Sequence, residues 1–296
     1  MSAGQPRADE PFEVIGVIDP SLLVQRWQAE FGIDVSASFS SIRQLRIIKG
    51  MNSGIVYFDP PVVGDEDLYR GLSKRAWYYP EDKWELRRSL ADIRPGQKLL
   101  EVGCGRGAYV ARAAARGADV LGVELNRDAV AYARGRGLNI SDVNVYEAPA
   151  EWKQAFDVVS AFQVMEHVPD PVGFCKTLYT FVKPGGHLHI AVPNGAGFMA
   201  AADGLLDGPP HHVSRWTRQA LQYVGQLVGA DRTRVIVGPL EALHVDVYLD
   251  VLRRRFGRVA VNRFTRPIAK TLLLAGGRFA VAGHSLLAIY RASPVA

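Results

Sequence analysis

The sequence predicts an α/β protein built on an open, mostly parallel sheet with helices on both faces. Short apolar runs alternate with stretches of about ten residues that favour helix, a pattern typical of repeated β-α-β units. The first of these runs, residues 98–102, leads directly into a glycine-rich loop. With 48% hydrophobic residues, the 296-residue chain has enough apolar surface to bury a core around such a sheet.

Three regions follow one another along the chain. Residues 1–81 form an N-terminal leader, residues 82–240 carry the regular alternation, and residues 241–296 combine a basic helical insert with the last strand of the core. The middle region is therefore expected to hold the functional site.

The leader contains too few regular elements to specify its fold. Its first 11 residues are polar, without the apolar segment of a signal peptide, and predict disorder. Residues 21–31 favour a helix and the serine-rich stretch 36–41 favours a turn. Two apolar runs, 45–48 and 55–58, predict strands.

The core elements are separated by glycine and proline residues, which end helices and form turns. The expected strands are 98–102, 119–123, 139–145, 156–161 and 187–192, and the expected helices are 82–90, 108–116, 127–134 and 171–182, the last ended by residues 183–186. A further helix at 218–228 and two strands at 234–237 and 285–290 are expected to complete the sheet.

Residues suited to ligand binding follow the first two strands. In an open α/β sheet, ligands bind beyond the carboxyl ends of the strands. The loop after the first strand supplies Gly103, Cys104, Gly105 and Gly107. Glycine lets a backbone turn sharply and approach a ligand closely. Glu124 ends the second strand, where its carboxylate can accept both hydroxyls of a ribose. The pattern predicts a nucleoside-binding site.

A glycine loop after a first strand also occurs in NAD(P)-dependent oxidoreductases, which are an alternative. The spacing here is G-x-G-x-G rather than G-x-G-x-x-G, and Glu101 precedes the loop by two positions. A carboxylate there would repel a pyrophosphate but could attract a ligand that carries ammonium and sulfonium groups. Alternatively, Glu101 accepts hydrogen bonds from backbone N–H groups and has no contact with a ligand. A non-catalytic protein with this fold is another alternative, against which the intact loop argues.

The ordered motifs of the core resemble those of class I S-adenosylmethionine-dependent (SAM-dependent) methyltransferases, which have a Rossmann-like fold. The matching segments are LLEVGCGRG at 99–107, VE at 123–124, FDVV at 156–159, EHV at 166–168 and KPGG at 183–186. The resemblance implies a methyltransferase whose cofactor is SAM.

The same resemblance implies positions for the cofactor. The glycine loop would lie along the methionine part of SAM, Glu101 would face its amino group, and Glu124 would hold the ribose. The remaining implied contacts are Leu125 and Asn144 with the adenine, and Phe162 and Gln163 with the methionine.

Methyl transfer to a hydroxyl requires a group that manages the acceptor proton, and histidine is suited to this near neutral pH. His167 follows the fourth strand at the rim of the cofactor site. His211 and His212 follow Pro209 and Pro210, which make the loop rigid. We predict that these three histidines are catalytic. Alternatively, His167 caps the following helix, and His211 and His212 lie on the surface near Trp216.

A metal site made of Glu166, His167 and one of the later histidines is a further alternative. No single segment holds a complete ligand set, so we expect no bound metal. The two cysteines, Cys104 and Cys175, lie far apart and predict neither a zinc site nor a disulfide, which suits a cytoplasmic protein.

Residues 77–85, WYYPEDKWE, precede the first core strand. Their rings could lie against a sulfonium by cation–π attraction, and Lys83 could bind the cofactor carboxylate. Tyr79 and Lys83 are therefore predicted cofactor contacts. The alternative is a helix that Trp77 and Trp84 anchor in the core.

This segment, with residues 162–167, 192–194 and 209–212, resembles bacterial methyltransferases that modify polysaccharides and sugars. It is similar, more loosely, to ubiquinone-type O-methyltransferases. The first resemblance implies O-methylation of a sugar hydroxyl, free, nucleotide-linked or in a polysaccharide. The second leaves a hydroxyl of a quinone, lipid or secondary metabolite as the alternative. Either way the acceptor is a small molecule or a glycan.

Residues 251–296 contain nine Lys or Arg and no Asp or Glu. They could cover the acceptor site and attract a phosphorylated substrate, lie as a peripheral helix on an anionic membrane, or form a solvated basic helix. Nucleic acid is not an expected partner. Residues 58–62, FDPPV, resemble a motif of base-methylating enzymes, but Val62 offers no aromatic face to a flipped base.

Overall fold

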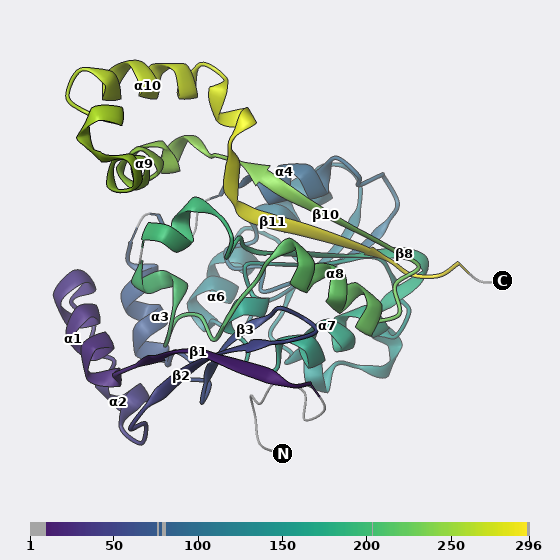
Figure 1. Ribbon diagram of the computed structural model, residues 1–296. Helices are drawn as coiled ribbons and strands as arrows, with labels where there is room; N and C mark the ends of the chain where they lie inside the picture. Colours follow the sequence, from purple (N-terminus) through teal and green to yellow (C-terminus); the bar gives the residue numbers. More distant parts are fainter. Residues whose placement is uncertain (1–9, 76, 79–80, 203, 295–296) are drawn as a thin grey trace.

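The computed structural model describes residues 10–75, 77–78, 81–202 and 204–294. These residues form two sheets (Figure 1). The larger has seven strands in the order β10-β11-β8-β7-β4-β5-β6, and the smaller has the order β1-β2-β3-β9. In the larger sheet, β4 to β8 run parallel, β11 joins β8 antiparallel and β10 joins β11 antiparallel. This confirms the predicted open, mostly parallel α/β fold.

The larger sheet consists of β4 (Lys98–Val102), β5 (Asp119–Val123), β6 (Ile140–Ser141), β7 (Phe156–Phe162), β8 (Val182–Pro193), β10 (Arg232–Pro239) and β11 (Ala282–Arg291). The smaller consists of β1 (Phe12–Ile18), β2 (Leu45–Gly50), β3 (Val56–Asp59) and β9 (Ser214–Arg215). The α-helices are α1 (Pro20–Phe31), α2 (Ser36–Phe39), α3 (Glu66–Ser73), α4 (Trp84–Leu90), α5 (Ala108–Ala114), α6 (Arg127–Gly135), α7 (Pro171–Thr180), α8 (Arg218–Leu227), α9 (Val245–Ala260) and α10 (Thr265–Leu274).

Helices cover both faces of the larger sheet because successive residues of a strand point to opposite sides. Leu99 and Val158 pack with α4, α5 and α6 on one face. Their neighbours Leu100 and Val159 pack with α7, α8 and residues of the smaller sheet on the other. The parallel strands therefore end at one common edge, where the loops that follow β4, β5, β7 and β8 come together.

Four local expectations differ from the structure. The third core strand was expected at 139–145, but β6 is shorter because Asn144 caps a 3-10 helix, Val145–Glu147. Residues 183–186 do not end a helix; they lie in β8, where Gly186 accepts a backbone hydrogen bond from Ala292. Residues 36–39 are a short helix rather than a turn, and strand β1 was not expected.

The leader is joined to the loop that carries the later histidines. Strand β3 pairs with β9, and the Phe58 N–H donates to the Val213 carbonyl at 3.1 Å. On the other side of the leader, the indole of Trp27 donates to the Pro209 carbonyl at 3.2 Å. Residues 209–213 are therefore held from two directions by residues that precede them by 155 to 182 positions in the sequence.

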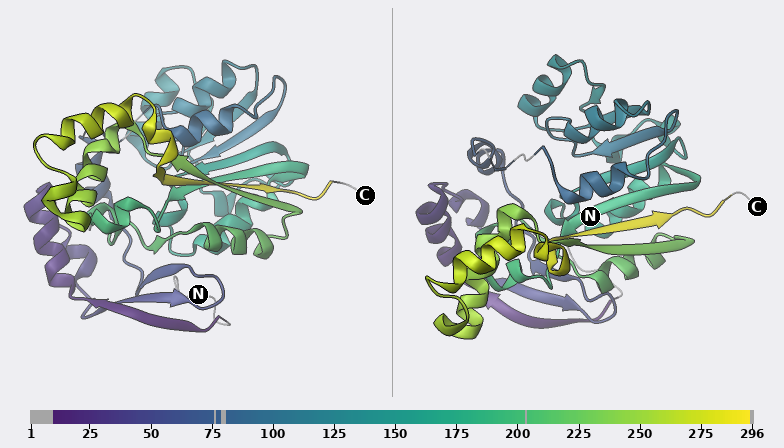
Figure 2. Two further views of the ribbon diagram at one scale, coloured as in Figure 1. Left: turned by 45° about the horizontal axis from the view of Figure 1, so that its top comes forward. Right: turned by 90° about the horizontal axis from the view of Figure 1, so that it is seen from above.

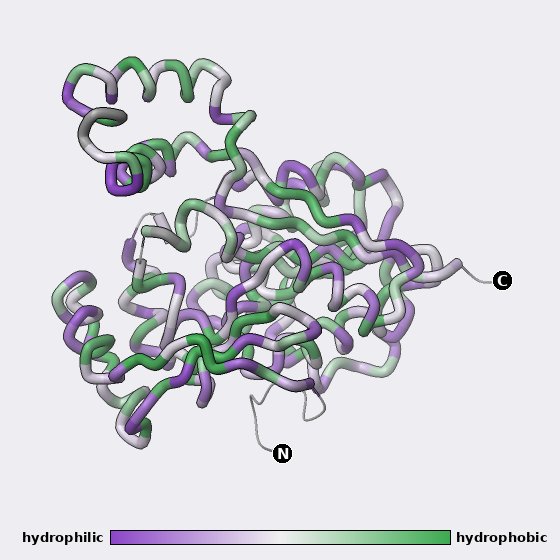
Figure 3. Tube along the Cα trace, in the orientation of Figure 1, coloured by the Kyte–Doolittle hydropathy of each residue, from purple (hydrophilic) through white to green (hydrophobic). Residues whose placement is uncertain are grey.

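Helices α9 and α10 form an arm that projects beyond the sheet (Figures 1 and 2). A small core of Leu240, Val245, Leu249 and Val261 holds its base. Apolar segments recur along α10 (Figure 3). None of the helices in the described ranges is both long and apolar enough to cross a membrane.

Candidate active site

The glycine loop has a backbone that only glycine adopts without strain. Its three glycines have φ angles of 72°, 54° and 78°. A β-carbon on Gly103 would lie 2.4 Å from Cγ2 of Val164. The N–H groups of Gly103 and Cys104 donate to the Val123 carbonyl at 2.8 and 3.0 Å, which fixes the loop against the end of β5. The loop therefore presents bare backbone at the carboxyl edge of the sheet.

Two carboxyl groups flank this loop. One oxygen of Glu124 accepts the Gly105 N–H, and the other accepts the N–H groups of Leu125 and Asn126, all at 2.8 Å. Glu101 is buried, and its Oε2 has no hydrogen-bond partner in the described part of the chain. Burial raises the pKa of Glu101 well above its ordinary value, and the nearby Glu124 raises it further. A buried carboxyl oxygen that lacks a partner fits a cationic ligand group, and this pair of acids disfavours a pyrophosphate.

The other predicted cofactor residues lie around this loop. Leu125 is 61% exposed beside Glu124, as a residue that covers an adenine should be. The Asn144 side chain accepts the Tyr146 N–H at 3.1 Å. Phe162 packs in the core against Tyr109, with ring centroids 4.9 Å apart. Tyr79 lies outside the described residues. These contacts with the cofactor remain predictions.

Gln163 follows β7 in a conformation that is rare for a residue other than glycine. Its φ is 58°, and such angles commonly persist where the surroundings hold them for a function. Its side-chain amide donates to Glu85 at 3.1 Å and to Ser285 at 3.3 Å. Gln163 thus links α4 to β11 directly above the end of the sheet.

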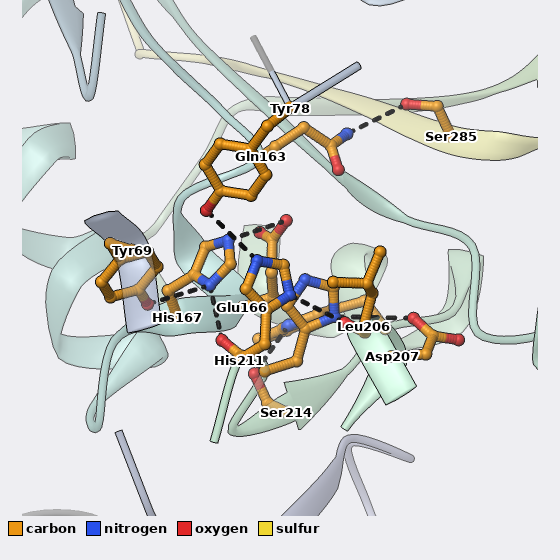
Figure 4. A network of polar contacts seen from close by, with 12 residues as sticks. Tyr69, Tyr78, Gln163, Glu166, His167, Leu206, Asp207, His211, Ser214 and Ser285 are labelled. Carbon is orange, nitrogen blue, oxygen red and sulfur yellow. Dashed lines mark hydrogen bonds and ion pairs between the residues drawn. The ribbon is translucent and has the colours of Figure 1, made fainter. Parts of the chain in front are cut away.

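The structure brings the three predicted catalytic histidines together. Figure 4 labels His167 and His211. The ring centroid of His167 lies 4.6 Å from that of His211 and 4.8 Å from that of His212. The rings of His211 and His212 are stacked, with their centroids 4.5 Å apart. One side-chain nitrogen of each residue lies within 4.8 Å of the others. We call these three residues the imidazole cluster. Because His211 and His212 are buried, the alternative of a surface pair is wrong.

Hydrogen bonds at Nδ1 set the orientation of these rings. Nδ1 of His167 lies 2.6 Å from the His211 carbonyl, and Nδ1 of His211 lies 2.9 Å from the Leu206 carbonyl. A carbonyl only accepts, so both nitrogens carry the proton. Nδ1 of His212 lies 3.5 Å from a carboxylate oxygen of Asp207. Each ring therefore keeps the lone pair of its Nε2, and Nε2 of His211 also faces the Tyr78 hydroxyl at 3.3 Å.

Burial keeps the imidazole cluster neutral. It lowers the pKa of His211 to about 4 and holds the pKa values of His167 and His212 well below the ordinary value. The rings also disfavour protonation of one another. At neutral pH the cluster therefore offers unprotonated nitrogen acceptors.

Glu166 lies beside the cluster, only 1% exposed, with Oε1 at 3.9 Å from Nε2 of His167. Neither of its carboxyl oxygens has a hydrogen-bond partner among the residues that the structure describes. Burial raises the pKa of Glu166 to about 8, although the charge of Lys83 opposes this. Its backbone carbonyl accepts the Val213 N–H at 2.8 Å, which ties residues 165–167 to the later histidine loop.

Two described residues of segment 77–85 act on the imidazole cluster. Tyr78 contacts His211, and the charge of Lys83 acts on Glu166 and His167. Trp84 is partly buried in the core, but Trp77 is 48% exposed, so the alternative in which both tryptophans anchor a helix in the core is wrong for Trp77.

Sequence reasoning missed several residues of this site. Tyr69 of α3 lies 3.4 Å from Nδ1 of His167. His244 and His284 lie with ring centroids 5.2 Å apart, and their Nδ1 atoms are buried without a partner in the described residues. The charge of His284 would also disfavour protonation of His212, which places this pair next to the cluster. Of these residues, only Asp207 could have been predicted from the sequence, because it lies four residues before His211.

Comparison with known proteins supports the predicted methyltransferase. A family model described as "Methyltransferase domain" matches residues 77–231. A ubiquinone biosynthesis O-methyltransferase of Cronobacter sakazakii is 32% identical over 67% of this chain and 90% of its own length. The enzyme of the same name from Acinetobacter baumannii is 40% identical over 33% of this chain, and the match spans 45% of that relative.

Solved structures show the same fold. A SAM-dependent methyltransferase from Archaeoglobus fulgidus superposes with a TM-score of 0.54 over 75% of this chain and 99% of its own, at 16% sequence identity. At that identity the similarity establishes the fold alone.

Proposed function

Because the chain belongs to the class I SAM-dependent methyltransferases, we propose that it transfers a methyl group from SAM to a hydroxyl bound at the imidazole cluster. The observation that carries this proposal is the convergence of His167, His211 and His212 next to the glycine loop. Val164 packs on Gly103, and Glu166 follows only two residues later. Residues 164–166 therefore connect the glycine loop to the cluster.

In this proposal, the residues around the glycine loop bind and orient SAM. When bound, SAM supplies a methyl group activated on a sulfonium. The carboxylate of Glu124, which three backbone N–H groups hold in place, would accept the ribose hydroxyls. The carboxyl group of Glu101, whose Oε2 has no partner in the described residues, would pair with the ammonium group. Much of the rate enhancement in such a transfer comes from alignment of the acceptor oxygen, which the rigid cluster would hold.

We propose that the acceptor is a ring hydroxyl of a quinone-type molecule. The relatives named as ubiquinone biosynthesis O-methyltransferases support this alternative, and no comparison supports the sugar hydroxyl that the sequence favoured. Aromatic side chains suited to contact such a ring lie nearby. Tyr69 and Tyr78 contact His211 of the cluster, and Phe198 contacts His244 and Tyr248.

The test is a methylation assay with purified protein, SAM and a panel of hydroxylated quinols, catechols and sugars. We expect a methyl ether on a quinol or catechol, detected by mass spectrometry, and S-adenosylhomocysteine (SAH) in equal amount. Methylation of sugars only would contradict the acceptor class. Absence of SAH and SAM binding in calorimetry would contradict the activity itself.

We also propose that the α9–α10 arm contacts an anionic membrane, where a lipid-phase acceptor would be found. Three exposed apolar residues recur every four positions: Phe264, which caps the start of α10, and Ile268 and Leu272 within the helix. Arg263 lies over Phe264, with 4.6 Å between the guanidinium and the ring centroid. Apolar side chains bordered by arginine are typical of helices at a lipid surface. Protein that fails to co-sediment with anionic vesicles at low salt would contradict this proposal.

A further inference from the structure

The imidazole cluster has the hydrogen-bond arrangement of metal-binding histidines. In such sites one ring nitrogen binds the metal, and the other donates to a carbonyl or carboxylate that orients the ring. Here the acceptors are the carbonyls of His211 and Leu206 and the carboxylate of Asp207. Each Nδ1 thus has an acceptor beside it, which leaves Nε2 as the candidate ligand atom of each ring. One ring nitrogen of each histidine lies within 4.8 Å of those of the other two.

Glu166 provides a second, independent observation. A carboxyl group that is 1% exposed and has no hydrogen-bond partner in the described residues is costly to bury. Its Oε1 lies 3.9 Å from Nε2 of His167, on the side of that ring away from the anchored Nδ1. A cation between the two would satisfy the carboxylate and supply the missing partner.

We propose that His167, His211, His212 and Glu166 bind one divalent transition-metal ion. Three imidazole nitrogens favour zinc, cobalt, nickel or copper over magnesium, which prefers oxygen ligands. Three histidines with one further position is also a ligand set used by zinc. This reverses the expectation that no metal is bound, which rested on the ligands being spread over two segments.

Small rotations would bring the ligands to bonding distance. The three histidine nitrogens lie within 4.8 Å of one another. Around a tetrahedral ion with bonds of roughly 2.0–2.1 Å, they would need to approach one another to about 3.3 Å. Nε2 of His211 would exchange its contact with the Tyr78 hydroxyl for the ion. The positive charge of Lys83 opposes metal binding, and the carboxylate of Glu166 compensates for it.

One consequence rests on the proposed function. With three histidines and Glu166 as ligands, the ion would take the acceptor oxygen as a fifth ligand and would lower the pKa of its hydroxyl, as bound cations do for water. The three Nε2 atoms would then act as ligands, and the acceptor would contact the ion rather than the rings.

The experiment is a titration of chelator-treated, dialysed full-length protein with Zn²⁺ in a calorimeter, and with Co²⁺ followed by its visible absorption. We expect one ion per chain and absorption typical of nitrogen ligands. His167→Asn and His211→Asn keep a donor near the Nδ1 position but remove Nε2. Because even partners outside the coordination shell change metal affinity by about 10–100-fold, each variant should weaken binding by at least about 100-fold.

His187→Asn is the matched control, because it removes a histidine from β8 outside the cluster and should leave the metal affinity unchanged. SAH binding by each variant reports an intact fold. Wild-type protein that binds no Zn²⁺ or Co²⁺, or an unchanged affinity in both folded cluster variants, would overturn the proposal. The titrations do not require methyl transfer, so their failure is separate from failure of the methylation assay.

Discussion

The glycine loop and the imidazole cluster are neighbours that are built in opposite ways. The loop is a continuous stretch, residues 101–107, whose shape follows from backbone angles that glycine allows. The cluster joins side chains 44 residues apart in the sequence, and the orientation of each ring depends on partners elsewhere. Binding of the cofactor should therefore survive changes in the cluster, and the two functions should separate in variants.

The largest expected effect tests that separation directly. His211→Ala and His212→Ala should each lower kcat by at least about 100-fold, the lower range for loss of a group that manages a proton or its metal. The Kd of SAH should change by less than about twofold, because backbone hydrogen bonds to the end of β5, rather than the histidines, fix the glycine loop. Steady-state kinetics and calorimetry measure the two quantities. Unchanged turnover in both variants would remove the cluster from the reaction.

The reciprocal change acts on the cofactor side. Glu124→Gln removes the charge that aligns with the ribose, and hydrogen bonds to a charged group contribute about 1.5–3 kcal/mol. We expect SAH affinity to fall about 10–100-fold in calorimetry. Asp128→Asn, on the exposed first turn of α6, is a control that should leave SAH affinity unchanged. An equal loss in both variants would show a general charge effect.

The dependence of the loop on its backbone predicts a smaller effect, on stability. Gly103→Ala places a β-carbon against Val164 at a φ of 72°, and we expect a loss of about 1–2 kcal/mol in the free energy of unfolding. Gly135→Ala, at a helical position with open space, should be neutral or stabilising. Urea denaturation compares them. Equal stability of the two variants would contradict the strained-loop interpretation.

A buried histidine away from the cluster affects only the pH dependence of stability. Burial lowers the pKa of His189 to about 3; the charges of His187 and Arg88 also lower it, and that of Asp92 opposes them. Between pH 6.5 and 3 the unfolded chain binds this proton and the folded chain does not, so stability falls as the pH falls, by up to about 1.4 kcal/mol per unit. His189→Asn, which can still bond to Ser89, should reduce this slope in thermal unfolding. An unchanged slope would exclude this contribution.

The sequence was most informative where a function depends on neighbouring residues. The glycine spacing, Glu101 and Glu124 predicted the cofactor loop because strand, turn and carboxylate are local features. The sequence was less informative at β6 and at residues 183–186. There the structure depends on a cap, Asn144, and on a backbone partner, Ala292, that the local pattern does not reveal.

The sequence by itself determined the α/β fold, the family and the three histidines as candidates, because alternating hydrophobicity and glycine spacing depend only on residues close together in the sequence. Only the tertiary structure decided that these histidines meet, that Glu166 is buried beside them, and that Tyr69, Asp207, His244 and His284 surround them. The reason is physical. Side chains from distant segments come together only through the pairing of β3 with β9 and the burial of both segments, and no local preference encodes that contact.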